Sequence, residues 1–164
     1  MPPRWRERLT RLTTLPLCCP GASKRSLGGE RAEQIARTFW SAPTPEGAAE
    51  YMSVCMPLYN PSQSADWEGA RRRAISRFEV MFDFIQGEQR GMDMLADLAK
   101  VRCPTLVLAG ALDPITPTAC AEAIHRALPA DLARLEVFQA AGHGVHRDEP
   151  DTAEAVLRRF LNEG

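Results

Sequence analysis

The stretch that decides the fold is residues 103–161, CPTLVLAGALDPITPTACAEAIHRALPADLARLEVFQAAGHGVHRDEPDTAEAVLRRFL. Its apolar run Thr105–Gly110 is rich in β-formers and predicts a strand buried on both faces. Residues 118–128 predict a helix, Arg134–Phe138 a second strand, and 151–161 an amphipathic closing helix. Strand and helix alternate here with short connections, so we expect two parallel strands joined by a crossover helix, in an α/β fold.

Two residues that can take part in acid–base catalysis follow these strands. Asp113 lies three residues after Gly110, and His143 stands between two glycines in the loop after the second strand. Ligands of open parallel sheets bind at the carboxyl ends of the strands. A carboxylate there can fix the tautomer of an imidazole and stabilise its cation, while the other ring nitrogen acts as a general base. The spacing therefore favours Asp113 and His143 as catalytic residues.

Other interpretations of these residues exist. Asp113 precedes a proline and can serve as an Asx-turn carboxylate, and His143 can be a loop histidine bonded to backbone. His143, His146 and Asp148 together give an H-x-x-H spacing with a carboxylate. This H-x-x-H lies in a predicted loop, however, whereas zinc proteases hold such a pair on a helix. We therefore expect no metal and no cofactor.

The chain before residue 100 predicts helices. Residues 30–40 carry apolar side chains at helical spacing, and a second helix is expected from Pro45 to Pro57 with Thr44 as its N-cap. The turn residues of 59–69 predict a loop. Residues 70–86 repeat aromatic and aliphatic side chains every three or four positions, which predicts one amphipathic helix.

With these features the chain becomes recognisable. The segments VRCPTLVLAGALDPITP (101–117) and LEVFQAAGHGVHRDEPDTAEAVLRRFL (135–161) resemble the carboxyl-terminal half of the α/β-hydrolase fold. The helical region, with APTPEGAAEYMSVCMPLY and FEVMFDF, is similar to the cap of proline iminopeptidase-like members. The resemblance implies that Asp113 is the triad acid and His143 the triad base. In such peptidases cap carboxylates bind the free amino group of the substrate, which nominates Glu79 first and Glu88 second.

One part of the family pattern is absent from the sequence. The nucleophile of these hydrolases stands in a G-x-S-x-G turn before the acid and the histidine, and none of the seven serines has glycine at both flanking second positions. Ser23 comes nearest, in GASKR. A base and an acid without a nucleophile have nothing to activate, so we expect the chain to be a truncated hydrolase that is inactive alone.

Charge sets the first residues apart. Residues 1–25 carry six Lys and Arg against one acid, a net of +5, whereas the whole chain has a net of −1. We interpret residues 1–26 as a disordered basic arm foreign to the fold, from a truncated or frameshifted reading frame, residues 27–99 as the helical cap, and 100–164 as hydrolase core. No apolar run approaches the ~20 residues that cross a bilayer. The five cysteines show no C-x-x-C spacing, so we expect no zinc site and no thioredoxin-like chemistry. Two of them are adjacent and the other three lie in apolar stretches, which favours a reducing cytoplasm.

The sequence therefore predicts a partial α/β-hydrolase fold and serine-hydrolase acyl transfer, of the kind that releases an N-terminal residue from a peptide. Small peptides or esters are the expected substrates, and the near-even charge predicts no nucleic-acid partner. Two strands would leave exposed edges, so self-association is expected. The alternative is a non-catalytic binding or regulatory module that uses the helical surface.

Overall fold

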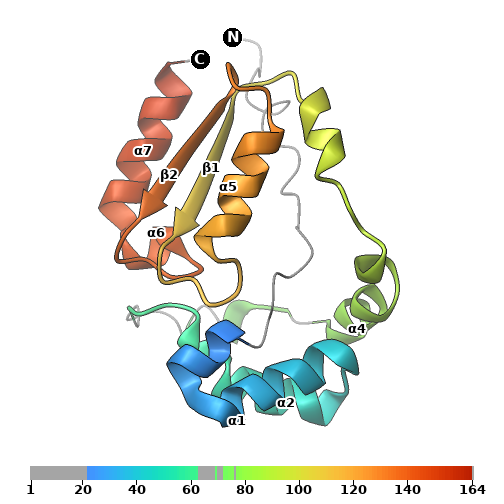
Figure 1. Cartoon of the computed structure of the whole chain (residues 1–164). Helices are drawn as coiled ribbons and strands as arrows, with labels where there is room; N and C mark the ends of the chain where they lie inside the picture. Colours follow the sequence, from blue (N-terminus) through green and yellow to red (C-terminus); the bar gives the residue numbers. More distant parts are fainter. Residues whose placement is uncertain (1–21, 63–68, 70–71, 76, 164) are drawn as a thin grey trace.

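The computed structural model describes residues 22–62, 69, 72–75 and 77–163. The expectation of a disordered arm falls mostly on residues outside these ranges, although helix α1 begins at Ala22. A helical unit and an α/β unit lie one above the other, and the carboxyl ends of both strands point toward the helical unit (Figure 1). This arrangement places the loops that follow the strands against the helical unit.

The α/β unit contains two parallel strands, as the sequence predicts. Strand β1 (Thr105–Gly110) pairs in register with β2 (Ala133–Phe138). Helix α5 (Thr118–Ala127) makes the crossover between them and packs on both strands. In Figure 1, α5 and α7 flank the strand pair on opposite sides.

The expectation that β1 is buried on both faces is wrong. Only Ala109 and Gly110 are fully buried, and the first four residues of the strand are only partly buried. Within the described ranges β1 pairs with β2 alone. The Thr105 and Ala111 amides donate toward β2, to Leu132 and Phe138 carbonyls. The backbone groups of the even-numbered residues of β1 therefore face away from β2, at a free edge of the sheet.

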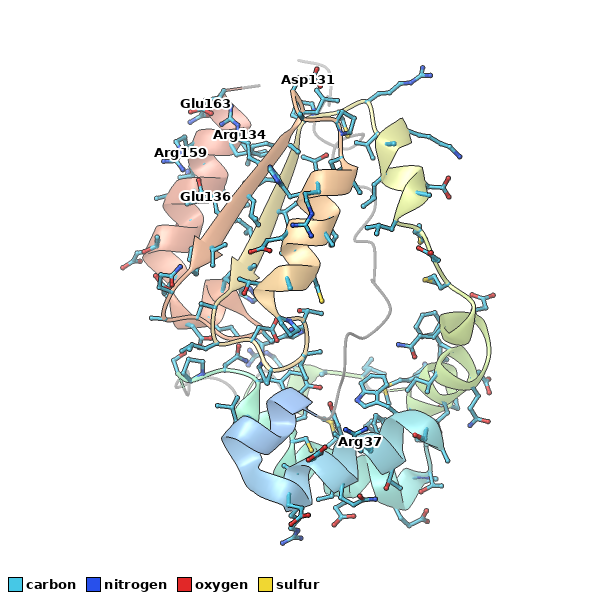
Figure 2. The ribbon with its side chains drawn as sticks, viewed as in Figure 1. Arg37, Asp131, Arg134, Glu136, Arg159 and Glu163 are labelled. Atoms are coloured by element: carbon cyan, nitrogen blue, oxygen red, sulfur yellow. The ribbon has the colours of Figure 1, made fainter. Side chains whose placement is uncertain are left out.

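The carboxyl-terminal segment forms two helices. Short α6 (Val145–Asp148) follows the His143 loop. Helix α7 (Pro150–Asn162) was expected over 151–161 and begins one residue earlier, with proline at its first position. Helix α7 packs Ala153 and Val156 against Phe138 of β2. Two ion pairs tie the same elements together, Arg159 with Glu136 at 2.8 Å and Arg134 with Glu163 (Figure 2). The sequence did not predict α6, because four residues are too few to show a helical period.

The helical unit packs around one aromatic cluster. Helix α1 (Ala22–Ser41) is interrupted at Gly29, whose φ of 71° breaks the helical path. Helix α2 (Pro45–Val54) begins as predicted, with the Thr44 hydroxyl accepting a hydrogen bond from the Gly47 amide at 3.0 Å. A 3₁₀ turn, η1 (Met56–Leu58), follows it. The buried core of this unit comprises Ala32, Ile35, Ala36, Phe39, Ala48, Tyr51, Cys55 and Ile85.

Helix α4 is shorter than its sequence pattern suggests. It spans Phe78–Gln86, whereas the pattern predicted a helix over 70–86, and residues 74 and 75 are not helical. Residues 72 and 73 are helical, but Ile75 is 87% exposed, so its apolar side chain gains little from packing. Because packing supplies most of the stability of short helices, the periodicity alone does not form one there. The 3₁₀ turns η2 (Glu88–Arg90) and η3 (Ala96–Lys100) lead back to β1.

No helix in the described ranges combines the length and apolar character needed to span a membrane.

Candidate active site

The turn after β1 holds the Asp113 side chain firmly. Its Oδ1 accepts hydrogen bonds from the amides of Ile115 at 2.7 Å and Thr116 at 3.1 Å. Its Oδ2 accepts one from the Thr116 hydroxyl at 2.6 Å. These bonds form the Asx-type turn that the sequence allowed before Pro114. These bonds within the turn fix the carboxylate in position independently of its other contacts.

The structure also brings His143 to the same carboxylate. The His143 Nδ1 lies 2.9 Å from the Asp113 Oδ2. The Asp113 side chain is only 6% exposed, and that of His143 is 42% exposed. An ionised carboxylate can only accept, so the bond places the proton of a neutral imidazole on Nδ1. The Nε2 atom makes no hydrogen bond to a described residue, and its lone pair is available to take a proton.

The hydrogen bonds to Asp113 keep it ionised. Burial by itself would raise the pKa of this carboxyl, but the bonds from His143, Thr116 and the Ile115 amide outweigh it. The pKa of Asp113 therefore lies below its ordinary value of 3.8. At neutral pH Asp113 is therefore a carboxylate, the state in which it can orient the imidazole of a general base.

Two glycines let the loops approach this closely. A Cβ on Gly110 would overlap the carbonyl oxygens of Ala141 and Gly142 and lie 2.8 Å from the Ala141 carbonyl carbon. A Cβ on Gly142 would overlap the Tyr59 carbonyl oxygen and lie 3.0 Å from the Asn60 Cα. The His143 loop is thus held between the end of β1 and the segment that follows η1.

That second neighbour, residues 59–62, makes several hydrogen bonds to the His143 loop. The His143 amide donates to the Tyr59 carbonyl at 2.7 Å, and the Gly144 amide donates to the Asn60 Oδ1 at 2.6 Å. The Ser62 amide donates to the Asp148 Oδ1 at 3.1 Å, and the Ser62 hydroxyl bonds to the same oxygen. Some 84 residues separate the partners, so no local pattern predicts these contacts.

A chain of aromatic residues anchors residues 59–62 to the helical core. The Tyr59 and Tyr51 hydroxyls are 2.6 Å apart, and the Trp40 indole donates to the Tyr51 hydroxyl at 3.2 Å. Tyr51 in turn stacks on Phe39 with ring centroids 4.5 Å apart. Burial raises the pKa of both Tyr51 and Tyr59, so both phenols stay protonated. The Tyr59 ring lies edge-on to the His143 imidazole, at 5.4 Å between centroids.

The cap carboxylates nominated from the sequence do not join this site. Glu79 lies in the first turn of α4 and pairs with Arg77 at 3.9 Å, and Glu88 lies in η2. Both side chains are exposed, and neither contacts Asp113 or His143 among the described residues. Figure 1 places α4 away from the carboxyl ends of the strands.

The donors of the alternative metal site are separately engaged. His143 bonds to Asp113, the Asp148 Oδ2 accepts from the Gly142 amide at 2.7 Å, and His146 is exposed on α6. Within the described part of the chain, no three His, Cys, Asp or Glu side chains are placed to hold an ion. Asp148 instead bridges the His143 loop to Ser62.

The sequence of the chain is similar to known hydrolases. Residues 88–164 match the family model described as "TAP-like protein". "Putative carbamate hydrolase RutD" of Escherichia coli O7:K1 (strain IAI39 / ExPEC) is 28% identical over 125 residues, which cover 70% of this chain and 46% of RutD. The chain thus spans about half the length of the curated relatives that it matches.

Solved hydrolase structures share the fold. The esterase EaEST from Exiguobacterium antarcticum superposes with a TM-score of 0.61 and 18% identity, over 80% of this chain and 48% of the esterase. An alpha/beta fold family hydrolase from Bacillus anthracis str. Sterne gives 0.57 and 20%, over 81% and 47%. MenH from S. aureus gives 0.58 and 17%, over 87% and 54%. The chain has a partial α/β-hydrolase fold, as the sequence predicted.

Proposed function

We propose that Asp113 and His143 are the acid and the base of an acyl-transfer site. The 2.9 Å bond from Nδ1 to a buried carboxylate supports this proposal most directly, together with an Nε2 that bonds to no described residue. In a complete site Nε2 takes the proton of a nucleophilic hydroxyl as its oxygen bonds to the substrate carbonyl carbon. Asp113 stabilises the resulting imidazolium. His143 then gives the proton to the leaving group as the carbonyl–heteroatom bond breaks.

For the substrate we propose an ester or a carbamate. The names of RutD and of the esterase EaEST refer to these two classes, and in both a carbonyl carbon carries a heteroatom leaving group. The resemblance to proline iminopeptidases suggests instead a peptide with a free N-terminal proline, bound at its amino group by Glu79 or Glu88. That substrate would require the exposed carboxylates of α4 and η2 to come near His143.

We further propose that the nucleophile comes from residues outside this sequence. The 164 residues contain no G-x-S-x-G turn. We therefore expect the purified chain to hydrolyse p-nitrophenyl esters no faster than buffer, and to take no label from a fluorophosphonate probe. Ester turnover by the purified chain that disappears in His143→Ala would contradict this part of the proposal.

A chimera tests the proposed roles of Asp113 and His143. Its design replaces the aligned portion of RutD with this chain, so that RutD supplies the remainder of the fold. We expect ester or carbamate hydrolysis that falls about 10²–10⁴-fold in His143→Ala and in Asp113→Ala. The matched control is His146→Ala, which removes an exposed imidazole on α6 and should leave the rate unchanged. A folded chimera whose rate is insensitive to His143→Ala would refute the proposal.

A further inference from the structure

We propose that residues 59–62 act as a positioning latch, through which the helical unit sets the orientation of His143. This inference rests on the proposed acid–base role of His143 and deepens it. Asp113 contacts the imidazole ring of His143 but not its backbone. The bond from Nδ1 to Asp113 forms only if the His143 backbone holds the ring at the right angle. Residues 59–62 act on that backbone.

The latch contacts the loop on both sides of the histidine. The amides of His143 and Gly144 donate to the Tyr59 carbonyl and the Asn60 side chain. The Asp148 carboxylate accepts from the Gly142 amide with one oxygen and from Ser62 with the other. Three consecutive loop amides are therefore fixed, directly or through one carboxylate, by a segment that belongs to the helical unit.

The latch is itself rigid at one end. The Tyr59 hydroxyl bonds to that of Tyr51, which is 3% exposed in the helical core and also bonds to Trp40. The backbone of Gly142 approaches Tyr59 so closely that no Cβ fits between them. A displacement of the helical unit would therefore be transmitted to the loop, and would change the angle at which the imidazole meets Asp113.

The test compares substitutions in the latch by the tautomer of His143. In the full chain with ¹⁵N-labelled histidine, the ring ¹⁵N shifts at about pH 8.5, above the ordinary titration range of histidine, report the ratio of the Nδ1–H and Nε2–H forms. We expect the Nδ1–H form to dominate in the unaltered chain. Asn60→Ala removes the acceptor for the Gly144 amide and should lower the ratio about fivefold, the effect of one lost hydrogen bond. Asn60→Asp keeps an oxygen acceptor and should restore it.

Two further variants keep the test decisive. Gln34→Ala removes an exposed amide whose hydrogen bond to Thr38 stays within α1, and should leave the ratio unchanged. Ser62→Ala removes an exposed hydroxyl from the Asp148 bridge and should lower the ratio in the same direction as Asn60→Ala. If Asn60→Ala does not fold, the tautomer ratio in Ser62→Ala tests the latch by itself.

The outcomes separate the latch from the proposed function. A dominant Nδ1–H form that changes less than twofold in both latch variants would overturn the latch and leave the acid–base pair standing. An unaltered chain without an excess of the Nδ1–H form would refute the pair itself. A lowered free energy of unfolding without a change in tautomer would mark the contacts as structural only, and would also overturn the latch.

Discussion

Gly110→Ala should break the approach between β1 and the His143 loop. The added Cβ would lie 2.8 Å from the Ala141 carbonyl carbon, where ordinary contacts begin at 3.4 Å, and would overlap two carbonyl oxygens. Backbone atoms cannot rotate away as a side chain can. The contact with the carbon alone requires a movement of about 0.6 Å, and the closer overlaps with the two oxygens require more. Such overpacking costs about 1–3 kcal/mol. Losing the bond from the Leu112 amide to the Ala141 carbonyl adds about 1 kcal/mol.

We therefore expect Gly110→Ala to lower the free energy of unfolding by about 2–4 kcal/mol and to reduce the Nδ1–H form of His143. Urea unfolding followed by circular dichroism measures the first effect, and ring ¹⁵N shifts the second. Gly91→Ala is the matched control, because nothing lies within 4 Å of a Cβ there and its φ is −107°. That substitution should be neutral or stabilise by up to about 1 kcal/mol. Equal stability of the two variants, with the Nδ1–H form retained, would refute the reasoning.

Three further results are expected. The pKa of Asp113 is lower in the folded chain than in the unfolded one, so its contribution to stability is complete above about pH 4 and is lost as the pH falls through the folded pKa. In a plot of unfolding free energy against pH, Asp113→Asn should therefore lose less stability at acid pH than the unaltered chain. Parallel curves for the two proteins would contradict this. Tyr51→Phe should lower the free energy of unfolding by about 1–2 kcal/mol, since it removes the hydroxyl that the Trp40 indole and the Tyr59 hydroxyl share. Tyr59→Phe keeps the acceptor for Trp40 and should lower it less, as measured by urea unfolding. The reverse order would show that Tyr51 is not the centre of this network. The free edge of β1 should cause the chain to associate as its concentration rises, as measured by sedimentation equilibrium. Leu106→Pro removes an amide that faces away from β2 and should weaken this association. A chain that stays monomeric at all concentrations would disprove the role of the edge.

The α/β unit could be predicted because its signals are local. The apolar run Thr105–Gly110 and the helix stop at Pro129 each depend on a few neighbouring residues, and the parallel pairing follows from the crossover between them. The juxtaposition of Asp113 and His143 could also be anticipated, since the ends of adjacent parallel strands meet at one edge. The N-cap at Thr44 was equally local and was correctly predicted.

The remaining features depend on contacts between distant parts of the chain. The helix expected over 70–86 is interrupted at residues 74 and 75, where Ile75 is 87% exposed, and periodicity cannot reveal that exposure. The partial burial of β1 depends on which elements cover it, and a local apolar run does not encode that. Asn60 and Ser62 looked like ordinary loop residues, and their partners lie 84–86 positions away.

The most direct test of the proposed acid–base pair is the ring ¹⁵N spectrum of His143 in the unaltered chain and in Asp113→Ala. We expect the Nδ1–H tautomer in the unaltered chain, because the buried Asp113 carboxylate can only accept a hydrogen bond. In Asp113→Ala that preference should disappear, while the signals of His125 and His146 stay in place. Identical His143 spectra in the two proteins would show that Asp113 does not orient the imidazole, and would contradict the assignment of this site.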